Sequence, residues 1–273
     1  MMQTRFYNGP KPRIFAHRGS SGNAPENTMP SFELAVEQGT DILEMDVHAT
    51  KDGHIVVMHD HVLDRTTNGT GPIPDVTLDE LKKLDAGCKY SPDGGKTFPY
   101  RGKGITVPTL REVAERFPDI PFNIEIKECE TPNERTAYDI LKELGHAEIT
   151  FLAAEKDSMI ERVRAVDAGL PTNLCGTEVL EFLQCLFQNN WEGYTPPGSA
   201  LQIPEHYEGM PVLTPELLEA SRRLGIEVHI WTVNDEADMR RLLEMGVDGI
   251  MTDYPDRLVK VVREMGLRPD LEK

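Results

Sequence analysis

Short apolar runs alternate with longer amphipathic stretches along most of the chain from residue 12 onward. Short runs rich in Ile, Val, Leu and Phe are typical of buried strands, and the stretches between them have helical spacing. We predict strands at Arg13–His17, Asp41–Val47, Ile55–Met58, Phe122–Lys127, Ile149–Ala153, Thr172–Gly176, Ala200–Ile203, Glu227–Trp231 and Gly249–Thr252. Helices are predicted between most of these strands, an alternation that favours a parallel sheet.

Four helix starts carry capping signals, in which a residue with a short polar side chain precedes the helical stretch. These signals are Asn27-Thr28-Met29-Pro30, Pro108-Thr109-Leu110, Thr214-Pro215-Glu216 and Asn234-Asp235-Glu236.

The strand Ile55–Met58 does not fit a parallel arrangement. It follows Asp41–Val47 across Lys51-Asp52-Gly53, and the pair Asp-Gly favours a tight hairpin. A parallel neighbour would need a crossover of about a dozen residues, for which there is no room. We therefore predict that Ile55–Met58 runs antiparallel, and that the other eight strands close a TIM (βα)₈ barrel of the α/β class.

Residues 60–107 interrupt this rhythm with many Gly, Pro, Asp and Thr residues and one short helix predicted at Leu78–Leu84. They also carry the apolar residues Leu81, Leu84, Tyr90, Phe98, Tyr100 and Ile105. We therefore expect a small inserted subdomain after the second strand, packed on the barrel. The 273 residues, 39% of them hydrophobic, suit one large domain, so residues 1–273 are predicted to form a single catalytic unit.

The charge balance limits the partners that the chain can bind. Lys and Arg number 29 and Asp and Glu number 46, a net charge of -17, which disfavours nucleic acid and anionic membrane surfaces. No run of about 18 apolar residues predicts membrane insertion. Met1–Pro12 lacks the apolar region of a signal peptide, so we expect a cytoplasmic protein. The cysteines, Cys88, Cys129, Cys175 and Cys185, form no C-x-x-C pair, which argues against structural zinc and a disulfide framework.

Charged residues recur at a spacing of two in otherwise apolar strands. Glu44 and Asp46 share one face of their strand, and Glu125 and Lys127 share one face of another, together with Asn123. Active sites of (βα)₈ barrels lie at the carboxyl ends of the strands. Three carboxylates from two adjacent strands would bind one divalent cation, Mg²⁺ or Ca²⁺. The alternative is a solvated face or ion-paired structural groups, but unpaired charges in such strands are costly to bury.

Other residues near the strand ends suggest acid–base chemistry on an anion. His17 and His59 titrate near neutral pH and are candidate general acid and base. Arg18 matches the bidentate geometry of a phosphate. Lys127 is an ion-pair partner of Glu125, a group that stabilises transition-state charge, or both, and we favour the second role. Trp231 either packs in the core or lines the substrate pocket.

The remaining histidines receive no catalytic role. His146, His206 and His229 are predicted to be structural, the last of them deep in the barrel. His48 has the opposite parity to Asp46 and His61 falls in the insertion, so both are left unassigned.

In order along the chain, a series of motifs resembles the glycerophosphodiester phosphodiesterase family over residues 12–264. The motifs are Phe15-Ala16-His17-Arg18-Gly19, Ala24-Pro25-Glu26-Asn27-Thr28, Leu43-Glu44-Met45-Asp46-Val47, His59-Asp60, Leu63-Asp64-Arg65-Thr66-Thr67-Asn68-Gly69-Thr70-Gly71, Pro108-Thr109-Leu110, Asn123-Ile124-Glu125-Ile126-Lys127, Trp231-Thr232-Val233-Asn234 and Gly246-Val247-Asp248-Gly249-Ile250-Met251-Thr252-Asp253-Tyr254-Pro255. The resemblance implies a TIM barrel with an insertion after the second strand, and hydrolysis of small-molecule glycerophosphodiesters to glycerol 3-phosphate and an alcohol.

The resemblance also implies a role for each site residue. His17 and His59 would be the catalytic pair, Glu44, Asp46 and Glu125 the ligands of the divalent cation, and Arg18 and Lys127 the phosphate contacts. The chain departs from the family pattern at Thr150-Phe151, and residues 185–211 carry no recognisable signature. These departures leave the preferred leaving alcohol open. The sequence also does not identify the physiological metal or the oligomeric state.

Two rival functions remain. A lysophospholipase D-type lipid phosphodiesterase would need an apolar groove or a membrane-binding surface, which the acidic composition does not favour. A non-catalytic barrel that binds a glycerol phosphate would be expected to have lost a histidine or a carboxylate of the set. Our working hypothesis for the enzyme takes His17 as the first general base and His59 as the general acid. It allows the adjacent glycerol hydroxyl of the substrate to act as the nucleophile.

Overall fold

The computed structural model of the protein describes residues 4–127 and 133–271. Two of the sequence predictions concern residues outside this range. Cys129 enters the disulfide prediction, and residues 1–3 belong to the segment considered as a signal peptide. Within those residues, Cys88, Cys175 and Cys185 are free thiols, and no described helix is long and apolar enough to cross a membrane.

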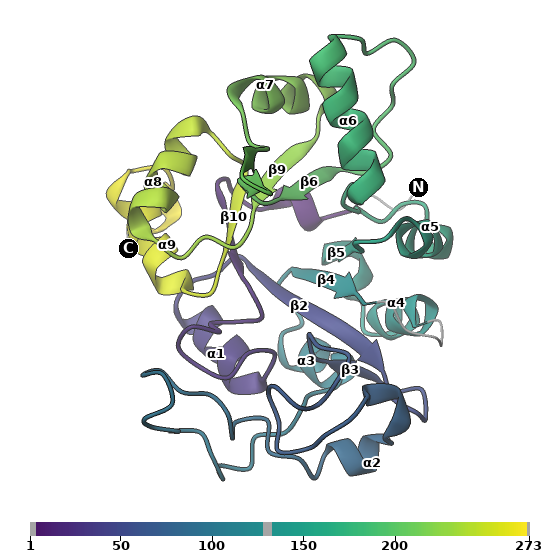
Figure 1. Ribbon diagram of the computed structural model, residues 1–273, viewed down its shortest axis with the longest axis vertical. Helices are drawn as coiled ribbons and strands as arrows, with labels where there is room; N and C mark the ends of the chain where they lie inside the picture. The colour runs from purple at the N-terminus through teal and green to yellow at the C-terminus, as the bar shows by residue number, and fades with distance from the viewer. Residues whose placement is uncertain (1–3, 128–132, 272–273) are drawn as a thin grey trace.

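The core of the fold is a curled parallel sheet with helices around its outside (Figure 1). Hydrogen-bonded neighbours follow the order β5-β4-β2-β1-β10-β9-β6. These strands are β1 (Arg13–Ala16), β2 (Ile42–Ala49), β4 (Phe122–Ile126), β5 (Thr150–Ala153), β6 (Ala200–Ile203), β9 (Glu227–Ile230) and β10 (Gly249–Thr252). The predicted TIM-barrel architecture is therefore confirmed.

The ring closes between β5 and β6 through a very short segment. Thr172 pairs in parallel with Leu152, and Asn173 with Ala200, as isolated bridges. The longer strand predicted at Thr172–Gly176 does not form. One reason is that the Asn173 side-chain amide bonds to both the N–H and the carbonyl of Ala154, so the side chain takes the place of backbone pairing.

Helices follow most of the strands, as the alternation predicted. They are α1 (Met29–Glu37), α2 (Leu78–Leu81), α3 (Leu110–Arg116), α4 (Glu134–Glu143), α5 (Asp157–Val166), α6 (Gly176–Gln188), α7 (Pro215–Leu224), α8 (Glu236–Met245) and α9 (Pro255–Glu264). Short 3₁₀ helices lie at Phe6–Asn8, Ile73–Asp75, Ala147–Ile149 and Pro269–Leu271. At three of the predicted helix starts, Thr109, Thr214 and Asp235 accept bonds from backbone N–H groups. Thr28 instead donates to the carbonyl of Pro25.

Two hairpins accompany the barrel strands. The predicted one pairs β3 (Ile55–Val57) antiparallel with the end of β2 and brings His59 back toward the barrel. The second joins β7 (His206–Tyr207) to β8 (Met210–Pro211), in a region where no strand was predicted. The prediction of a structural histidine is wrong for His206, which is exposed on β7.

The insertion packs on β3 through its own small core. Its buried residues, Leu63, Ile73, Leu81, Ala86 and Val107, cluster with Val56 and Met58. Its helix α2 ends at Leu81, three residues before the predicted end at Leu84, although Leu84 still packs against the cluster. At the far side, the Tyr90 hydroxyl donates to the carbonyl of Gly22 at 2.9 Å, which links the insertion to the loop after β1.

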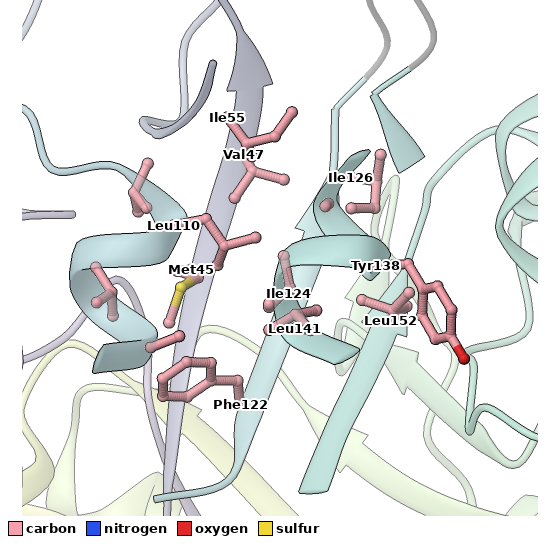
Figure 2. Packing of buried hydrophobic residues seen from close by; sticks show 14 of the residues in the cluster. Met45, Val47, Ile55, Leu110, Phe122, Ile124, Ile126, Tyr138, Leu141 and Leu152 are labelled. Atoms are coloured by element: carbon pink, nitrogen blue, oxygen red, sulfur yellow. The ribbon is translucent and has the colours of Figure 1, made fainter. Parts of the chain in front are cut away.

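Alternation along the strands separates the apolar core from the barrel interior. Met45 and Val47 on β2, and Ile124 and Ile126 on β4, pack outward against residues such as Leu110 of α3 (Figure 2). Because successive side chains of a strand point to opposite faces, the intervening polar residues point into the barrel. The charged and polar residues that recur at a spacing of two in the sequence thus form the inner surface of β2 and β4.

At the amino ends of the strands, a buried ion pair joins β1 to β9. Arg13 donates from Nε and Nη2 to the two carboxylate oxygens of Glu227 at 2.7 and 2.9 Å, and its side chain is 2% exposed. His229, fully buried, contacts the same carboxylate at 3.0 Å, in agreement with its predicted structural role.

We expect Glu227→Gln to lower the free energy of unfolding by about 3 kcal/mol, because it leaves the buried Arg13 charge without its counter-charge. Burial alone raises the pKa of Glu227, but bonds from Arg13 and His229 outweigh it and lower the net pKa. The ion pair therefore stabilises the fold fully above about pH 4.3, the pKa of a glutamate in the unfolded chain. This stabilisation is lost as the pH falls through the lower pKa that Glu227 has in the folded protein.

Urea unfolding followed by circular dichroism, at neutral and acidic pH, measures this difference. Glu143→Gln is the matched control, since Glu143 accepts two bonds from Arg111 at an exposed position. That control is expected to cost less than about 1 kcal/mol. Equal losses for the two variants at neutral pH would contradict the prediction.

Candidate active site

Parallel pairing places the polar residues of neighbouring strands side by side. In the register between β2 and β4, Glu44 lies opposite Asn123 and Asp46 opposite Glu125. His17 follows the end of β1, and its backbone N–H bonds to the carbonyl of Thr252 at the end of β10. The site therefore forms at the carboxyl ends of the strands, as predicted for this fold.

Glu44, Asp46 and Glu125 form the acidic centre of the site. Each offers a carboxylate oxygen, and these oxygens all lie within 4.8 Å of one another. Glu44 and Asp46 are buried, with relative exposures of 4% and 1%. Hard cations such as Mg²⁺ and Ca²⁺ prefer carboxylate oxygens as ligands, so this donor set fits one divalent cation.

Crowding of negative charge changes the acidities of this triad. Burial, followed by the charge of Asp46, raises the pKa of both Glu44 and Glu125. Burial alone would also raise the pKa of Asp46, but the charges of Lys127 and Arg18 outweigh it and lower the net pKa. The three carboxylates thus need more positive charge before all of them can ionise together.

The two cations predicted to bind phosphate lie over Asp46. Lys127 Nζ contacts an Asp46 oxygen at 3.0 Å and a Glu125 oxygen at 2.7 Å. Arg18 Nε lies 3.3 Å from the second Asp46 oxygen, and the Arg18 backbone N–H donates to Glu44 at 2.8 Å. The ion pair between Lys127 and Glu125, one of the two alternatives considered for Lys127, is therefore present, and both cations border the cleft.

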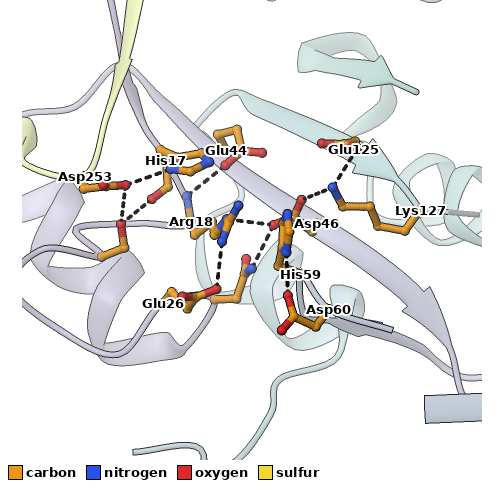
Figure 3. A network of polar contacts seen from close by, with 12 residues as sticks. His17, Arg18, Glu26, Glu44, Asp46, His59, Asp60, Glu125, Lys127 and Asp253 are labelled. Atoms are coloured by element: carbon orange, nitrogen blue, oxygen red, sulfur yellow. Dashed lines mark hydrogen bonds and ion pairs between the residues drawn. The ribbon is translucent and has the colours of Figure 1, made fainter. Parts of the chain in front are cut away.

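His17 is oriented by a carboxylate that the sequence did not single out. Its Nδ1 lies 2.7 Å from an oxygen of Asp253, which directly follows β10 (Figure 3). Asp253 also accepts bonds from Ser21 and Asn234. Burial on its own lowers the pKa of His17, but the bond to Asp253 and the charge of Glu44 contribute to a net rise.

His59 has a comparable partner on the opposite side of the site. Its Nδ1 lies 2.7 Å from an oxygen of Asp60, its neighbour in the chain (Figure 3). Asp60 is held by Arg65, which bonds to both of its oxygens and also to Glu26. In both histidines, use of Nδ1 leaves Nε2 as the nitrogen available for chemistry.

The surrounding side chains complete this arrangement. Asn27 donates to Asp46 at 3.0 Å, and Glu26 accepts a bond from Arg18. His48 is buried, with Nε2 3.0 Å from the backbone carbonyl of His59. Glu26, Asn27, Asp60 and Arg65 all lie in the motifs recognised in the sequence, but no strand period pointed to them because they belong to loops.

A cleft of about 800 Å³ opens over the site. Of the residues predicted for chemistry, it is lined by His17, Arg18, Glu44, His59, Glu125, Lys127 and Trp231. Trp231 is 43% exposed, so it borders the cleft instead of packing in the core. Asp46 lies beneath this surface, where it contacts both cations.

Comparison with known proteins shows to which family the chain is related. The sequence profile of the glycerophosphoryl diester phosphodiesterase family matches residues 17–257. The chain belongs to this family. The match spans both histidines, the three carboxylates and Trp231, which are the residues that the structure gathers around one cleft.

Individual relatives match almost the whole chain. A glycerophosphodiester phosphodiesterase of Caldanaerobacter subterraneus subsp. tengcongensis is 38% identical, covering 94% of this chain and 100% of its own. A human lysophospholipase D is 29% identical, covering 89% of this chain and 83% of its own. The structure of an Oleispira antarctica phosphodiesterase in complex with the product sn-glycerol-3-phosphate has a TM-score of 0.75 and 28% identity, covering 92% and 96% of the two chains.

Proposed function

We propose that the chain hydrolyses glycerophosphodiesters to glycerol 3-phosphate and an alcohol, with His17 and His59 as the acid–base pair and one divalent cation, Mg²⁺ or Ca²⁺, as cofactor. The observation that carries this proposal is the arrangement of two histidines, each bonded to a carboxylate through Nδ1, around a carboxylate triad. Relatives that act on these diesters, and a structural neighbour that holds glycerol 3-phosphate, support the substrate class.

The proposed metal ligands are Glu44, Asp46 and Glu125. A divalent cation bound there would offset the negative charge of the phosphodiester and of the triad itself. One carboxylate oxygen of Asp46 contacts Lys127 and the other contacts Arg18. Asp46 therefore holds both cations beside the proposed metal site. Arg18 and Lys127 are therefore the proposed contacts for the non-bridging phosphate oxygens.

The histidines are proposed to move the protons. Asp253 and Asp60 fix the Nδ1 side of each ring, so each Nε2 is presented in a defined tautomer. One histidine would accept the proton of the attacking hydroxyl, and the other would donate a proton to the leaving alkoxide. We retain His17 as the base and His59 as the acid of the first step, with water or the adjacent glycerol hydroxyl as the nucleophile.

Asp253 is proposed to position His17 and to raise its pKa. We expect Asp253→Asn to lower kcat for glycerophosphocholine roughly 10- to 100-fold, because the amide cannot stabilise an imidazolium. The pKa of His17 should fall with the loss of the carboxylate, so the limb of the pH–rate profile that reports His17 should move to lower pH.

The pH dependence of kcat separates this role from a structural one. Ser21→Ala is the control, because it removes one bond to Asp253 and keeps the carboxylate beside His17. A profile that loses height in Asp253→Asn without moving along the pH axis would contradict the proposal.

Two further proposals complete the functional assignment. Residues 1–273 would act as one catalytic unit, with residues 60–107 supplying Asp60 and Arg65 at its edge. A cytoplasmic location is consistent with the free thiols of Cys88, Cys175 and Cys185.

The rival function is that of a non-catalytic protein that binds a glycerol phosphate. It predicts that calorimetry detects binding of glycerol 3-phosphate while no diester is hydrolysed.

A further inference from the structure

Arg65, in the insertion, joins two carboxylates that each contact a residue of the proposed site. Its Nε and Nη2 donate to the two oxygens of Asp60 at 2.7 and 3.0 Å. Its Nη1 and Nη2 donate to the two oxygens of Glu26 at 2.6 and 2.8 Å. Asp60 contacts Nδ1 of His59, and Figure 3 shows this contact. Glu26 accepts a bond from Arg18 at 3.0 Å. One guanidinium thus connects the proposed acid histidine with a proposed phosphate contact.

The planar shape of the Arg65 guanidinium makes this double contact possible. An arginine presents its N–H groups in one plane at fixed angles, so it can bond to both oxygens of a carboxylate on each of two sides. The two carboxylates are therefore held in a fixed position relative to each other. A lysine ammonium carries the same charge, but it is a single point on a flexible stem and cannot hold both carboxylates in this way.

The backbone around Arg65 is anchored, so the guanidinium extends from a fixed base. Leu63 is buried in the small core of the insertion, and Thr67 is also buried. The hydroxyl and the backbone N–H of Thr67 both donate to the carbonyl of Leu63, which closes a turn around Arg65. The backbone N–H of Leu63 donates in turn to the carbonyl of Gly71. Arg65 therefore projects from a hydrogen-bonded turn toward the two carboxylates.

The bonds from Arg65 also keep both carboxylates ionised. They lower the pKa of Asp60 well below the usual range of an aspartate. Burial on its own raises the pKa of Glu26, but the bonds and charges of Arg65 and Arg18 outweigh it and lower the net pKa. An ionised carboxylate only accepts hydrogen bonds. Asp60 and Glu26 are therefore both prepared to receive a bond from the active-site residue that they contact.

A purely structural role explains Arg65 less well. The insertion already packs on β3 through its own small core, and the Tyr90 hydroxyl links it to the loop after β1. The side chain of Arg65 is 46% exposed, and ion pairs at such positions contribute little to stability. Contacts other than those of Arg65 therefore hold the insertion on the barrel.

We propose that Arg65 is a positioning residue for the hydrolysis. Through Asp60 it holds the ring of His59 in place, and through Glu26 it holds the guanidinium of Arg18. Arg65 is not among the described residues that line the cleft, so it acts on the reaction through these two carboxylates. This inference rests on the proposed function and adds to it a residue that couples proton transfer to phosphate binding.

Arg65→Gln tests the inference with two measurements. We expect kcat for glycerophosphocholine to fall about 10²-fold, because small displacements of a reacting group have effects of this size. The affinity for glycerol 3-phosphate, measured by calorimetry, should fall about tenfold, because Arg18 is no longer held beside the phosphate position. Binding of this product involves no proton transfer, so it reports on the Arg18 side alone.

Arg241→Gln is the matched control. Arg241 is 43% exposed, donates to the two oxygens of Glu205 at 2.7 and 2.8 Å, and also contacts Asp238. Like Arg65, it is a partly exposed arginine between two carboxylates, and it is not among the described residues that line the cleft. We expect this variant to retain the wild-type kcat and the wild-type affinity for glycerol 3-phosphate.

Double variants separate positioning from a general structural defect. Because Arg65 acts on proton transfer through His59, adding Arg65→Gln to His59→Ala should lower kcat by only about threefold more. Likewise, adding Arg65→Gln to Arg18→Gln should leave the affinity for glycerol 3-phosphate almost unchanged. A structural defect would act by the same factor in every background. Arg65→Lys keeps the charge without the fork and should remain impaired in kcat by about tenfold.

The outcomes distinguish this inference from the proposed function. Wild-type kcat in Arg65→Gln, or full recovery in Arg65→Lys, overturns the positioning role and retains the proposed function. Equal losses of kcat in the wild-type and His59→Ala backgrounds, or a melting temperature of Arg65→Gln below the assay temperature, indicate a structural role and also overturn it. Absence of turnover in the unaltered protein overturns both proposals.

Discussion

His17→Ala and His59→Ala are each expected to lower kcat for glycerophosphocholine by about 10³-fold, within the usual range for loss of a positioned general acid or base. Neither ring is needed for the fold, because each is only partly buried and lies at the rim of the barrel. The double variant should lose little more than the more impaired single variant, because the two groups act in one reaction cycle.

The leaving group separates the roles of the two histidines. p-Nitrophenol leaves as a stable anion and needs no proton, so a glycerophosphate ester of p-nitrophenol bypasses the general acid. We expect His59→Ala to recover most of its activity on this ester, whereas His17→Ala stays impaired. The reverse pattern would exchange the two roles. Near wild-type turnover of glycerophosphocholine by either variant would remove that histidine from the mechanism.

Asp46→Asn is the second change with a large expected effect. Asp46 contacts Lys127, Arg18 and Asn27 and contributes to the carboxylate triad, so its loss changes both the metal site and the phosphate site. We expect the affinity for Mg²⁺ or Ca²⁺, measured by calorimetry, to fall at least tenfold, and kcat to fall by about 10²- to 10³-fold.

Chelation tests the same site in the unaltered protein. Exhaustive treatment with a chelator should abolish turnover, and adding back one divalent cation should restore it.

Asp52→Asn is the matched control for Asp46→Asn, since Asp52 is an exposed carboxylate in the β2–β3 hairpin and is not part of the triad. It should leave metal affinity and kcat unchanged. Full activity after chelation would show that the reaction does not depend on the metal, whatever the effect of Asp46→Asn.

The spacing of polar residues along the strands was enough to predict most of the inner surface of the barrel. Spacing of two in β2 and β4 was enough to place Glu44, Asp46 and Glu125 together, because neighbouring parallel strands align their carboxyl ends. The Asp52-Gly53 turn likewise predicted the return of the chain at β3, which carries His59 toward the site. These features follow from local backbone geometry.

The partners of the histidines could not be predicted in this way. Asp253 reaches His17 only because β10 closes the barrel against β1, a contact 236 residues apart in the sequence. Arg65 reaches Asp60 and Glu26 through loops, whose conformations follow no simple period. The pairing of each histidine with a carboxylate is therefore a property of the closed ring and of the insertion.

The β7–β8 hairpin was not predicted, for a related reason. The β7–β8 hairpin is built from strands of two residues, too short to show a pattern. Helix α6 has apolar residues on more than one side, and the sequence does not tell which of them face the core and which face the cleft. The predicted strand at Thr172–Gly176 failed similarly, because the Asn173 side chain replaced backbone pairing.

Phosphorus NMR of glycerophosphocholine incubated with the protein and Mg²⁺ or Ca²⁺ tests the central claim most directly, because it identifies both turnover and the bond that breaks. The account predicts that the diester signal is replaced by that of glycerol 3-phosphate, and that the replacement stops on chelation and in His17→Ala. Formation of phosphocholine and glycerol, or an unchanged diester signal with either cation, would contradict it.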